Sequence, residues 1–222
     1  MKNKKMRTVL TAGALASVLL VGGIAAYFTD FETKTNTFTV GEVGIELEEP
    51  KWTPPTNIVP NQEMTKDPTI TNNAVNDAYV FMEVVVPTYN IKTANADGSV
   101  NPAADTELFT YELNTGWVEV GQAVKDMAKN TTTHVYAYAK DDAMTALGKS
   151  AKAPVLFKDE KVKFVNVVED NTLHVESLND DVNMIVNGYA IQTSGINGGK
   201  TAPADVWLVV KTQIDGNKSP AA

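Results

Sequence analysis

The sequence contains no cysteine, and its 19 lysine and arginine residues are outnumbered by 27 aspartate and glutamate residues. Without thiols the chain has no disulfide bond, no cysteine nucleophile and no thiolate ligand for zinc. The formal net charge of −8 disfavours binding to nucleic acid and to anionic lipid surfaces. The composition therefore excludes thiol catalysis, argues against a nucleic-acid partner, and requires a fold held by apolar burial and backbone hydrogen bonds.

Histidine is scarce too, since the chain has only His134 and His174, forty positions apart. No His-Glu-x-x-His motif places two imidazoles on one helix face to bind zinc, and a catalytic zinc normally takes three protein ligands. The two histidines meet that need only if the fold brings them to one of Glu160, Glu169 or Asp170. We therefore predict no metal, no cofactor and no catalytic residues, and we expect both histidines half exposed in strands.

Long hydrophobic runs are confined to the N-terminus. Residues 9–26 form one apolar stretch that ends in glycine and alanine, and four basic residues precede it: Lys2, Lys4, Lys5 and Arg7. This arrangement is typical of a bacterial export signal. We predict a signal peptide over residues 1–26, cut by a signal peptidase after Ala25 or Ala26, and a secreted protein with a net charge of −12. The alternative is a retained transmembrane anchor over residues 8–28, because about 20 residues suffice to cross a bilayer.

Cleavage would leave an aromatic segment at the new N-terminus, which begins with Tyr27, Phe28, Thr29, Asp30 and Phe31. A free apolar strand is an aggregation hazard on a monomer, but it is suited to adding a strand to an open sheet edge. We therefore assign residues 27–35 as a donor-strand segment, residues 36–214 as one domain and residues 215–222 as a polar tail.

Most of the remaining sequence has the residue pattern of β-strands. Residues 78–86 form a nearly continuous apolar run, which suits a strand buried on both faces. Similar patterns predict further strands at 35–48, 69–71, 109–113, 117–120, 133–139, 162–168, 173–176, 182–192 and 206–214. A loop is expected at 90–106, and short helices at 121–129 and 141–150. The predicted fold class is all-β, a jelly-roll-like antiparallel β-sandwich with one or two short helices.

Two further patterns have simpler interpretations than a ligand site. Residues 195–201 read Gly-Ile-Asn-Gly-Gly-Lys-Thr, one residue short of a phosphate-binding loop, which also needs a helix directly after it. Residues 202–205, Ala-Pro-Ala-Asp, follow instead, so we predict a hairpin loop. The acidic pairs at 48–49, 141–142 and 180–181 are interpreted as solvated turns, because no calcium-binding loop of EF-hand spacing is present.

The order of several short motifs along the chain resembles the TasA/CalY (camelysin) family of secreted proteins. The matching segments are Gly22-Gly23, Ala25 to Asp30, Asn36-Thr37-Phe38-Thr39-Val40-Gly41, Val59-Pro60-Asn61-Gln62, Lys66-Asp67-Pro68, Asn72-Asn73, Asn76-Asp77-Ala78-Tyr79-Val80, Leu156-Phe157, Lys161 to Phe164 and Gly188-Tyr189-Ala190-Ile191-Gln192. No segment is specific alone, and the resemblance rests on their order. The chain departs from the family at Asn61, where glycine is usual, but asparagine tolerates a left-handed turn.

The resemblance implies a structural function in the matrix of Gram-positive biofilms. Members of the family lose their leaders to the SipW type of signal peptidase and polymerise into extracellular fibres built on a jelly-roll core. The N-terminal strand of each subunit completes the sheet of its neighbour, so the implied partners are further copies of this chain and an accessory matrix protein. Camelysins are also described as zinc metalloendopeptidases, and a monomeric surface adhesin is a third alternative.

Overall fold

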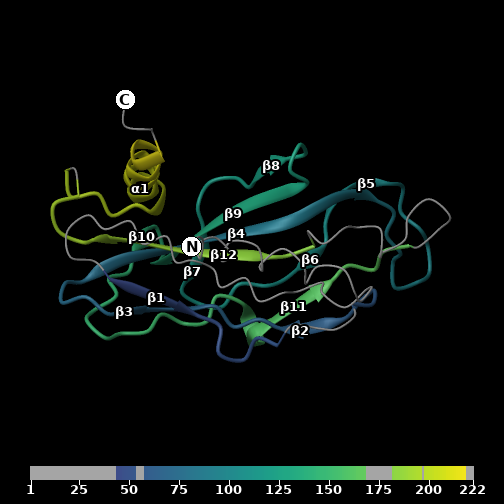
Figure 1. Ribbon diagram of the computed structural model, residues 1–222, viewed down its shortest axis with the longest axis horizontal. Helices are drawn as coiled ribbons and strands as arrows, with labels where there is room; N and C mark the ends of the chain where they lie inside the picture. The colour runs from purple at the N-terminus through teal and green to yellow at the C-terminus, as the bar shows by residue number, and fades with distance from the viewer. Residues whose placement is uncertain (1–43, 54–57, 169–181, 197, 219–222) are drawn as a thin grey trace, which may run out of the picture.

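The computed structural model describes residues 44–53, 58–168, 182–196 and 198–218, which form antiparallel β-sheets with one α-helix on the outside (Figure 1). The predicted all-β sandwich is confirmed. The elements are β1 (Ile45–Glu48), β2 (Glu63–Thr65), β3 (Thr69–Asn72), β4 (Ala78–Ile91), β5 (Ala104–Glu107), β6 (Phe109–Thr110), β7 (Trp117–Glu119), β8 (Val124–Asp126), β9 (Thr131–Lys140), β10 (Ala143–Met144), the 3-10 helix η1 (Lys158–Glu160), β11 (Lys161–Phe164), β12 (Ile185–Gln192) and α1 (Pro203–Lys218). The predicted signal peptide, the donor segment and the strand at 173–176 lie outside the described residues.

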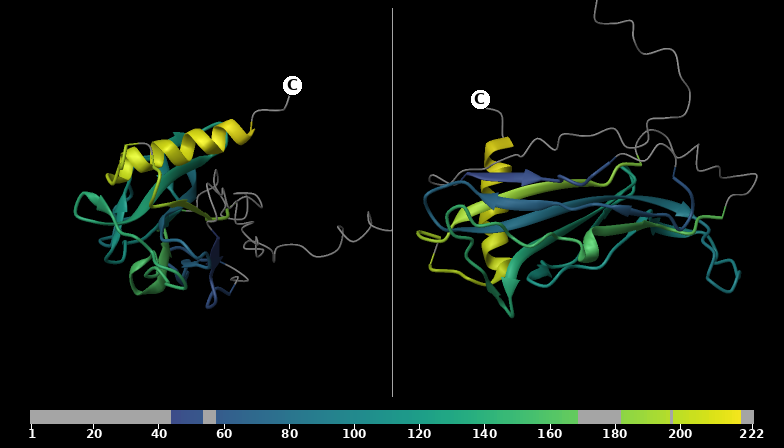
Figure 2. Two further views of the ribbon diagram at one scale, coloured as in Figure 1. Left: turned by 90° about the vertical axis from the view of Figure 1, so that its left-hand side faces the viewer. Right: turned by 90° about the horizontal axis from the view of Figure 1, so that it is seen from below.

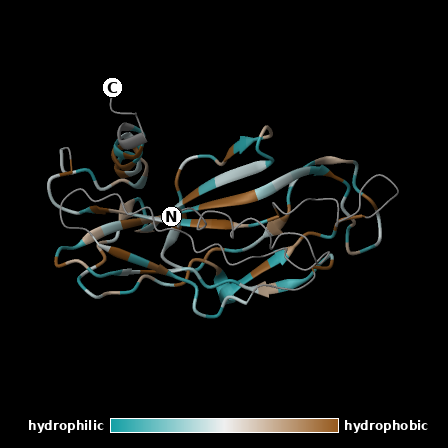
Figure 3. Ribbon diagram, viewed as in Figure 1, coloured by the Kyte–Doolittle hydropathy of each residue, from teal (hydrophilic) through white to brown (hydrophobic). Residues whose placement is uncertain are grey.

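The long strand β4 organises the larger sheet. Its residues 78–85 pair with β12, residues 81–87 pair with β9 and residues 88–91 pair with β5. β7, β8 and β10 in turn pair with β9. The apolar run at 78–86 correctly predicted a strand buried on both faces, because such a strand needs no row of polar side chains facing the solvent. Figure 3 shows the resulting hydrophobic stretches of β4 and β12 through the middle of the molecule.

The second layer consists of two smaller sheets, β1-β3 and β2-β11-β6. They enclose the main core together with the inner face of β4. The core cluster includes Val80, Met82, Val84 and Val86 from β4, and Phe109, Phe157 and Phe164 from the opposite layer. Each such side chain stabilises the fold by about 1.5–3 kcal/mol when it is fully buried. The core therefore lies between the layers and needs no covalent cross-link.

Helix α1 covers one end of the outer face of the larger sheet (Figures 1 and 2). Val206, Val210 and Ile214 recur every four residues along the helix and are all buried in a second core cluster, which also contains Phe81 of β4. Trp207 adds a ring contact, with its centroid 5.2 Å from that of Phe81. A spacing of four residues places these side chains on one helix face, so α1 is a local third layer.

The strand predicted at 206–214 is wrong, because this segment is α1, and the helix also includes the first four residues of the polar tail predicted at 215–222. Its valines favour strands, but Pro203 fits the first helical turn, where a missing N–H costs nothing. Asp205 in the same turn complements the helix dipole. The hairpin predicted at 195–201 is wrong as well, since this loop joins β12 to α1.

The short helices predicted at 121–129 and 141–150 are also wrong, because these segments contain β8 and β10 paired with β9. Asn130 and Asp141 have positive φ angles of 52° and 53° where the chain turns between these strands. A residue with a positive φ angle interrupts a helix. Pairing with β9 then outweighs the local helix propensity. The loop predicted at 90–106 is shorter than expected, because β4 and β5 extend into it from both sides.

The layers approach each other closely at Gly188 in β12. A Cβ atom on Gly188 would lie 3.4 Å from Cδ1 of both Ile45 and Ile70. We expect Gly188→Val to lower the free energy of unfolding by about 1–3 kcal/mol, because its extra methyl groups overpack this contact although valine favours strands. Urea denaturation of the purified protein measures this loss.

Gly148 supplies the matched control for this substitution. A Cβ there would have one neighbour within 4 Å, Oδ1 of Asp77 at 3.6 Å. Gly148→Val should therefore cost much less, and equal losses at the two glycines would contradict close packing at Gly188 as the cause.

Candidate functional site

Two edge strands, β1 and β12, lie in opposite layers on the same side of the sandwich. β1 pairs with β3 and β12 pairs with β4, and no other described strand is bonded to either of them. The two strands are in contact, since Gly188 of β12 packs against Ile45 and Leu47 of β1. Figure 2 (right) shows the purple β1 beside the yellow-green β12. The described residues thus bring two sheet edges together, and one of them, β1, is the first described strand of the chain.

An ion pair fixes the chain just after β1. Nζ of Lys66 lies 2.9 Å from Oε1 of Glu49 and donates a hydrogen bond of 3.0 Å to Oε2. The two side chains are only 6% and 17% exposed, and Nζ of Lys66 also lies 4.6 Å from the ring centroid of Trp52. Beside this pair, the carboxylate of Asp67 accepts hydrogen bonds of 3.1 and 3.2 Å from the backbone N–H of Lys51. β1 is therefore held at its end as well as by its ladder with β3.

The interpretation of residues 48–49 as a solvated turn is wrong: Glu49 is largely buried, and Glu48, although exposed, belongs to strand β1. Nothing in the local sequence separates the two, because the cation that buries Glu49 stands 17 residues along the chain. The segment Lys66-Asp67-Pro68 was noted as part of the family resemblance, but its sequence alone did not indicate that Lys66 pairs with Glu49.

His134 lies in β9, as predicted, but its side chain is only 14% exposed rather than half exposed. Nε2 lies 3.0 Å from Oε2 of Glu107 in β5, and Nδ1 lies 2.8 Å from Oε1 of Glu119 in β7. The ring stacks on Tyr136, with centroids 5.9 Å apart and planes 7° apart. The hydrogen bond to Glu107 raises the pKa of His134 above its ordinary value, partial burial opposes this, and the bond to Glu119 adds to the rise.

The residues suggested for a zinc site do not form one in the described part of the chain. Both ring nitrogens of His134 face carboxylate oxygens, so neither presents a free lone pair, and Glu160 is paired with Lys51 at 2.6 Å. His174, Glu169 and Asp170 lie outside the described residues. Among the residues that the structure does describe, no group of three or more histidine, aspartate or glutamate side chains could hold a metal ion. The donors that are visible therefore do not fit a catalytic zinc.

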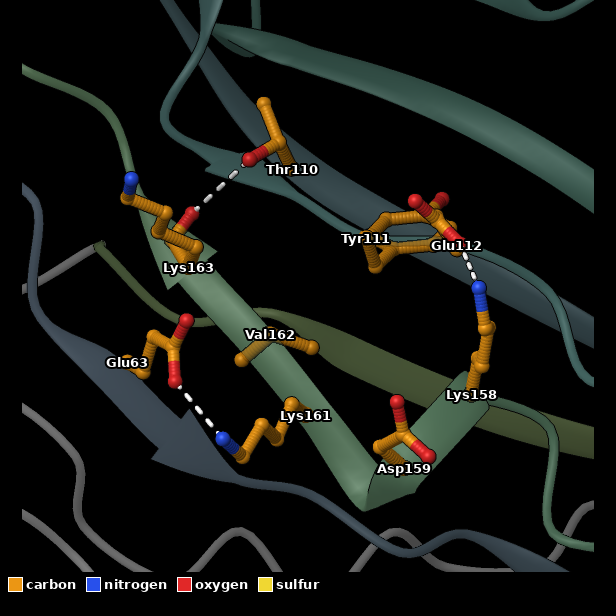
Figure 4. A pocket seen from close by; sticks show the side chains of 9 residues that line it. All are labelled: Glu63, Thr110, Tyr111, Glu112, Lys158, Asp159, Lys161, Val162 and Lys163. Atoms are coloured by element: carbon orange, nitrogen blue, oxygen red, sulfur yellow. Dashed lines mark hydrogen bonds and ion pairs between the residues drawn. The ribbon is translucent and has the colours of Figure 1, made fainter.

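A hollow of about 380 Å³ lies on the outside of the sheet β2-β11-β6 (Figure 4). Its lining side chains come from Glu63, Thr110, Tyr111, Glu112, Lys158, Asp159, Lys161, Val162 and Lys163. The charged groups largely neutralise one another: Lys161 is bonded to Glu63 at 2.8 Å, and Lys158 is bonded to Glu112. Exposed pairs of this kind contribute little to stability, and the hollow offers no excess charge to attract an ionic ligand.

The buried ion pair yields a stability prediction. Lys66→Met leaves the carboxylate of Glu49 buried without its cation, and we expect the free energy of unfolding to fall by at least about 2 kcal/mol. The double variant Lys66→Met/Glu49→Leu should recover much of this loss, because no charge then remains to be buried. Chemical denaturation of the variants measures both effects.

The control is Lys152→Met, which breaks an exposed pair with Glu48 near the same strand, where the atoms are 3.4 Å apart and the side chains are 50% and 44% exposed. We expect a loss of about 1 kcal/mol or less from it. A Lys66→Met loss no larger than this control would mean that the pair does not fix the end of β1.

No helix of the described residues is long and apolar enough to cross a membrane. Searches of curated proteins and of solved structures found no match to the chain. Residues 1–108, which include the predicted leader, the predicted donor segment and the strands through β5, match the family model described as camelysin metallo-endopeptidase. The match covers those motifs of the resemblance that precede residue 108, so the first part of the chain is similar to the camelysin family.

Proposed function

We propose that this chain is an exported structural protein whose subunits join head to tail into extracellular matrix fibres. The observation that carries the proposal is the pair of edge strands, β1 and β12, which are in contact and are each bonded to one described neighbour. An open sheet edge is a template on which another extended segment can pair. Residues 27–34 of one subunit would be that segment for the next subunit.

The donor segment has the chemistry that strand addition needs. Its backbone would continue the hydrogen-bond ladder, while Tyr27, Phe28 and Phe31 would supply apolar side chains to pockets on the acceptor. A segment that leaves one subunit and enters the next is a heterologous contact, which continues into a filament unless its rotation closes a ring. The acidic composition argues against nucleic acid as a partner, and the signal peptidase would be met only during export.

The direct test uses electron microscopy of residues 27–222 at raised concentration, beside the same protein without residues 27–34. We expect filaments from the first protein, and a folded monomer that does not polymerise from the second. Matching melting curves of the two monomers would show that the truncation leaves the sandwich intact. Filaments from the truncated protein would rule out the donor segment.

Phe28→Asp tests whether assembly depends on the apolar side chains of the donor segment or only on the presence of the segment. The variant keeps every residue but places a charge where an apolar pocket is expected, and an unpaired charge resists such burial strongly. We expect assembly to fail while the melting temperature changes little. Thr29→Ser, which keeps a hydroxyl and adds no charge, is the control and should still assemble.

The family description favours a metallo-endopeptidase as the second candidate. Its test is zinc analysis of protein prepared free of metal, with a chelator-sensitive casein digestion. Because the visible donors around His134 do not fit zinc, we expect no stoichiometric zinc and no such digestion. One zinc per chain with activity lost in His174→Ala would instead favour the enzyme. Protein that stays monomeric at high concentration yet binds a polymer would favour the adhesin.

A further inference from the structure

The side chain of His134 joins three strands that are separate in the sequence. Its own strand is β9, while Glu107 belongs to β5 and Glu119 belongs to β7. β5 pairs with β4 through four residues, and β7 pairs with β9 through three. Short ladders of this length open more easily than the long pairing of β4 with β9. The imidazole therefore ties two weakly held strands to the stable centre of the sheet.

We propose that His134 is a pH-sensitive latch, which holds β5 and β7 in place when its ring is protonated and releases them when it is neutral. An imidazolium has two N–H donors and can donate to both carboxylates, at 3.0 Å to Glu107 and at 2.8 Å to Glu119. A neutral imidazole has one donor and one lone pair. The lone pair would face a carboxylate oxygen, and two anionic groups would then flank an uncharged ring.

Two tyrosines and an ion pair on β5 and β8 belong to the surroundings of this contact. Tyr111 packs edge-on at a centroid distance of 6.3 Å, and its hydroxyl is hydrogen-bonded to that of Tyr136 at 2.8 Å. Burial raises the pKa of both tyrosines, so both stay neutral. Asp105 on β5 and Lys125 on β8 face each other at 3.8 Å. The two tyrosines therefore do not change their charge in the pH range of the latch.

The direction of the pH effect follows from the raised pKa of His134. The closed arrangement binds the proton more tightly than an open one, in which the ring has its ordinary pKa of about 6.5. The latch is therefore fully formed below that value and is lost as pH rises through the higher pKa of the closed state. Each unit of difference between the pKa of His134 in the closed and the open arrangement corresponds to about a tenfold change in the opening equilibrium.

Hydrogen exchange of the purified protein, followed by mass spectrometry at about pH 5.5 and about pH 8.5 and corrected for intrinsic rates, tests the latch. Peptides that cover residues 104–108 and 117–121 should lose protection at the higher pH. Peptides from β12 serve as the internal reference and should not change. Equal protection of all these peptides at both pH values would overturn the proposal.

Four variants assign the effect to the latch. His134→Gln has one donor group and no charge, so peptides 104–108 and 117–121 should exchange fast at both pH values. His134→Lys keeps a permanent positive charge and should protect them at both. Glu119→Gln removes one carboxylate and should move the transition to lower pH, which keeps the proposal testable if His134→Gln does not fold. His174→Gln removes the other histidine and should leave the transition unchanged; its loss in this variant would assign the titration elsewhere.

The latch rests on the geometry around β9 and does not depend on fibre assembly. Failure of the truncation experiment would leave the exchange result standing, and the reverse also holds.

Discussion

The structure depends on β4 being paired along both of its edges and buried on both of its faces. Its residues from Ala78 to Ile91 bond to β12, β9 and β5, so the larger sheet cannot form without it. One face contributes Val80, Met82, Val84 and Val86 to the core between the layers. The other face packs Phe81 into the cluster with α1. Because burial and pairing act on the same residues, this strand supplies the cohesion that disulfides supply in many small secreted domains.

Charged side chains stabilise the positions of the shorter segments around that centre. Lys66 and Glu49 hold the chain where it leaves β1, and His134 holds β5 and β7 against β9. Lys66 and His134 are both largely buried, and the carboxylates that they contact come from distant parts of the sequence. The contact of His134 responds to pH, because the charge of a histidine changes between about pH 5 and pH 8.

Sequence patterns predicted a strand correctly where apolar residues form a long run. The predictions were wrong where pairing with a distant strand determines the local structure. The apolar run at 78–86 located β4, while the valines at 206–210 were assigned to a strand although the four-residue spacing from Val206 to Ile214 and Pro203 indicated a helix. The segments 121–129 and 141–150 contain the short strands β8 and β10, which pair with β9. The carboxylates around His134 could not be predicted, because 27 and 15 residues separate them from the ring.

In the proposed fibre, subunits keep this sandwich and join through an added strand. Cryo-electron microscopy of filaments grown from residues 27–222 tests it most directly. We expect globular subunits with β4 and the core intact, and residues 27–34 of each subunit hydrogen-bonded to an edge strand, β1 or β12, of the next. Filaments in which the chains stack as identical strands perpendicular to the axis, or in which intact subunits touch without an exchanged strand, would contradict the claim.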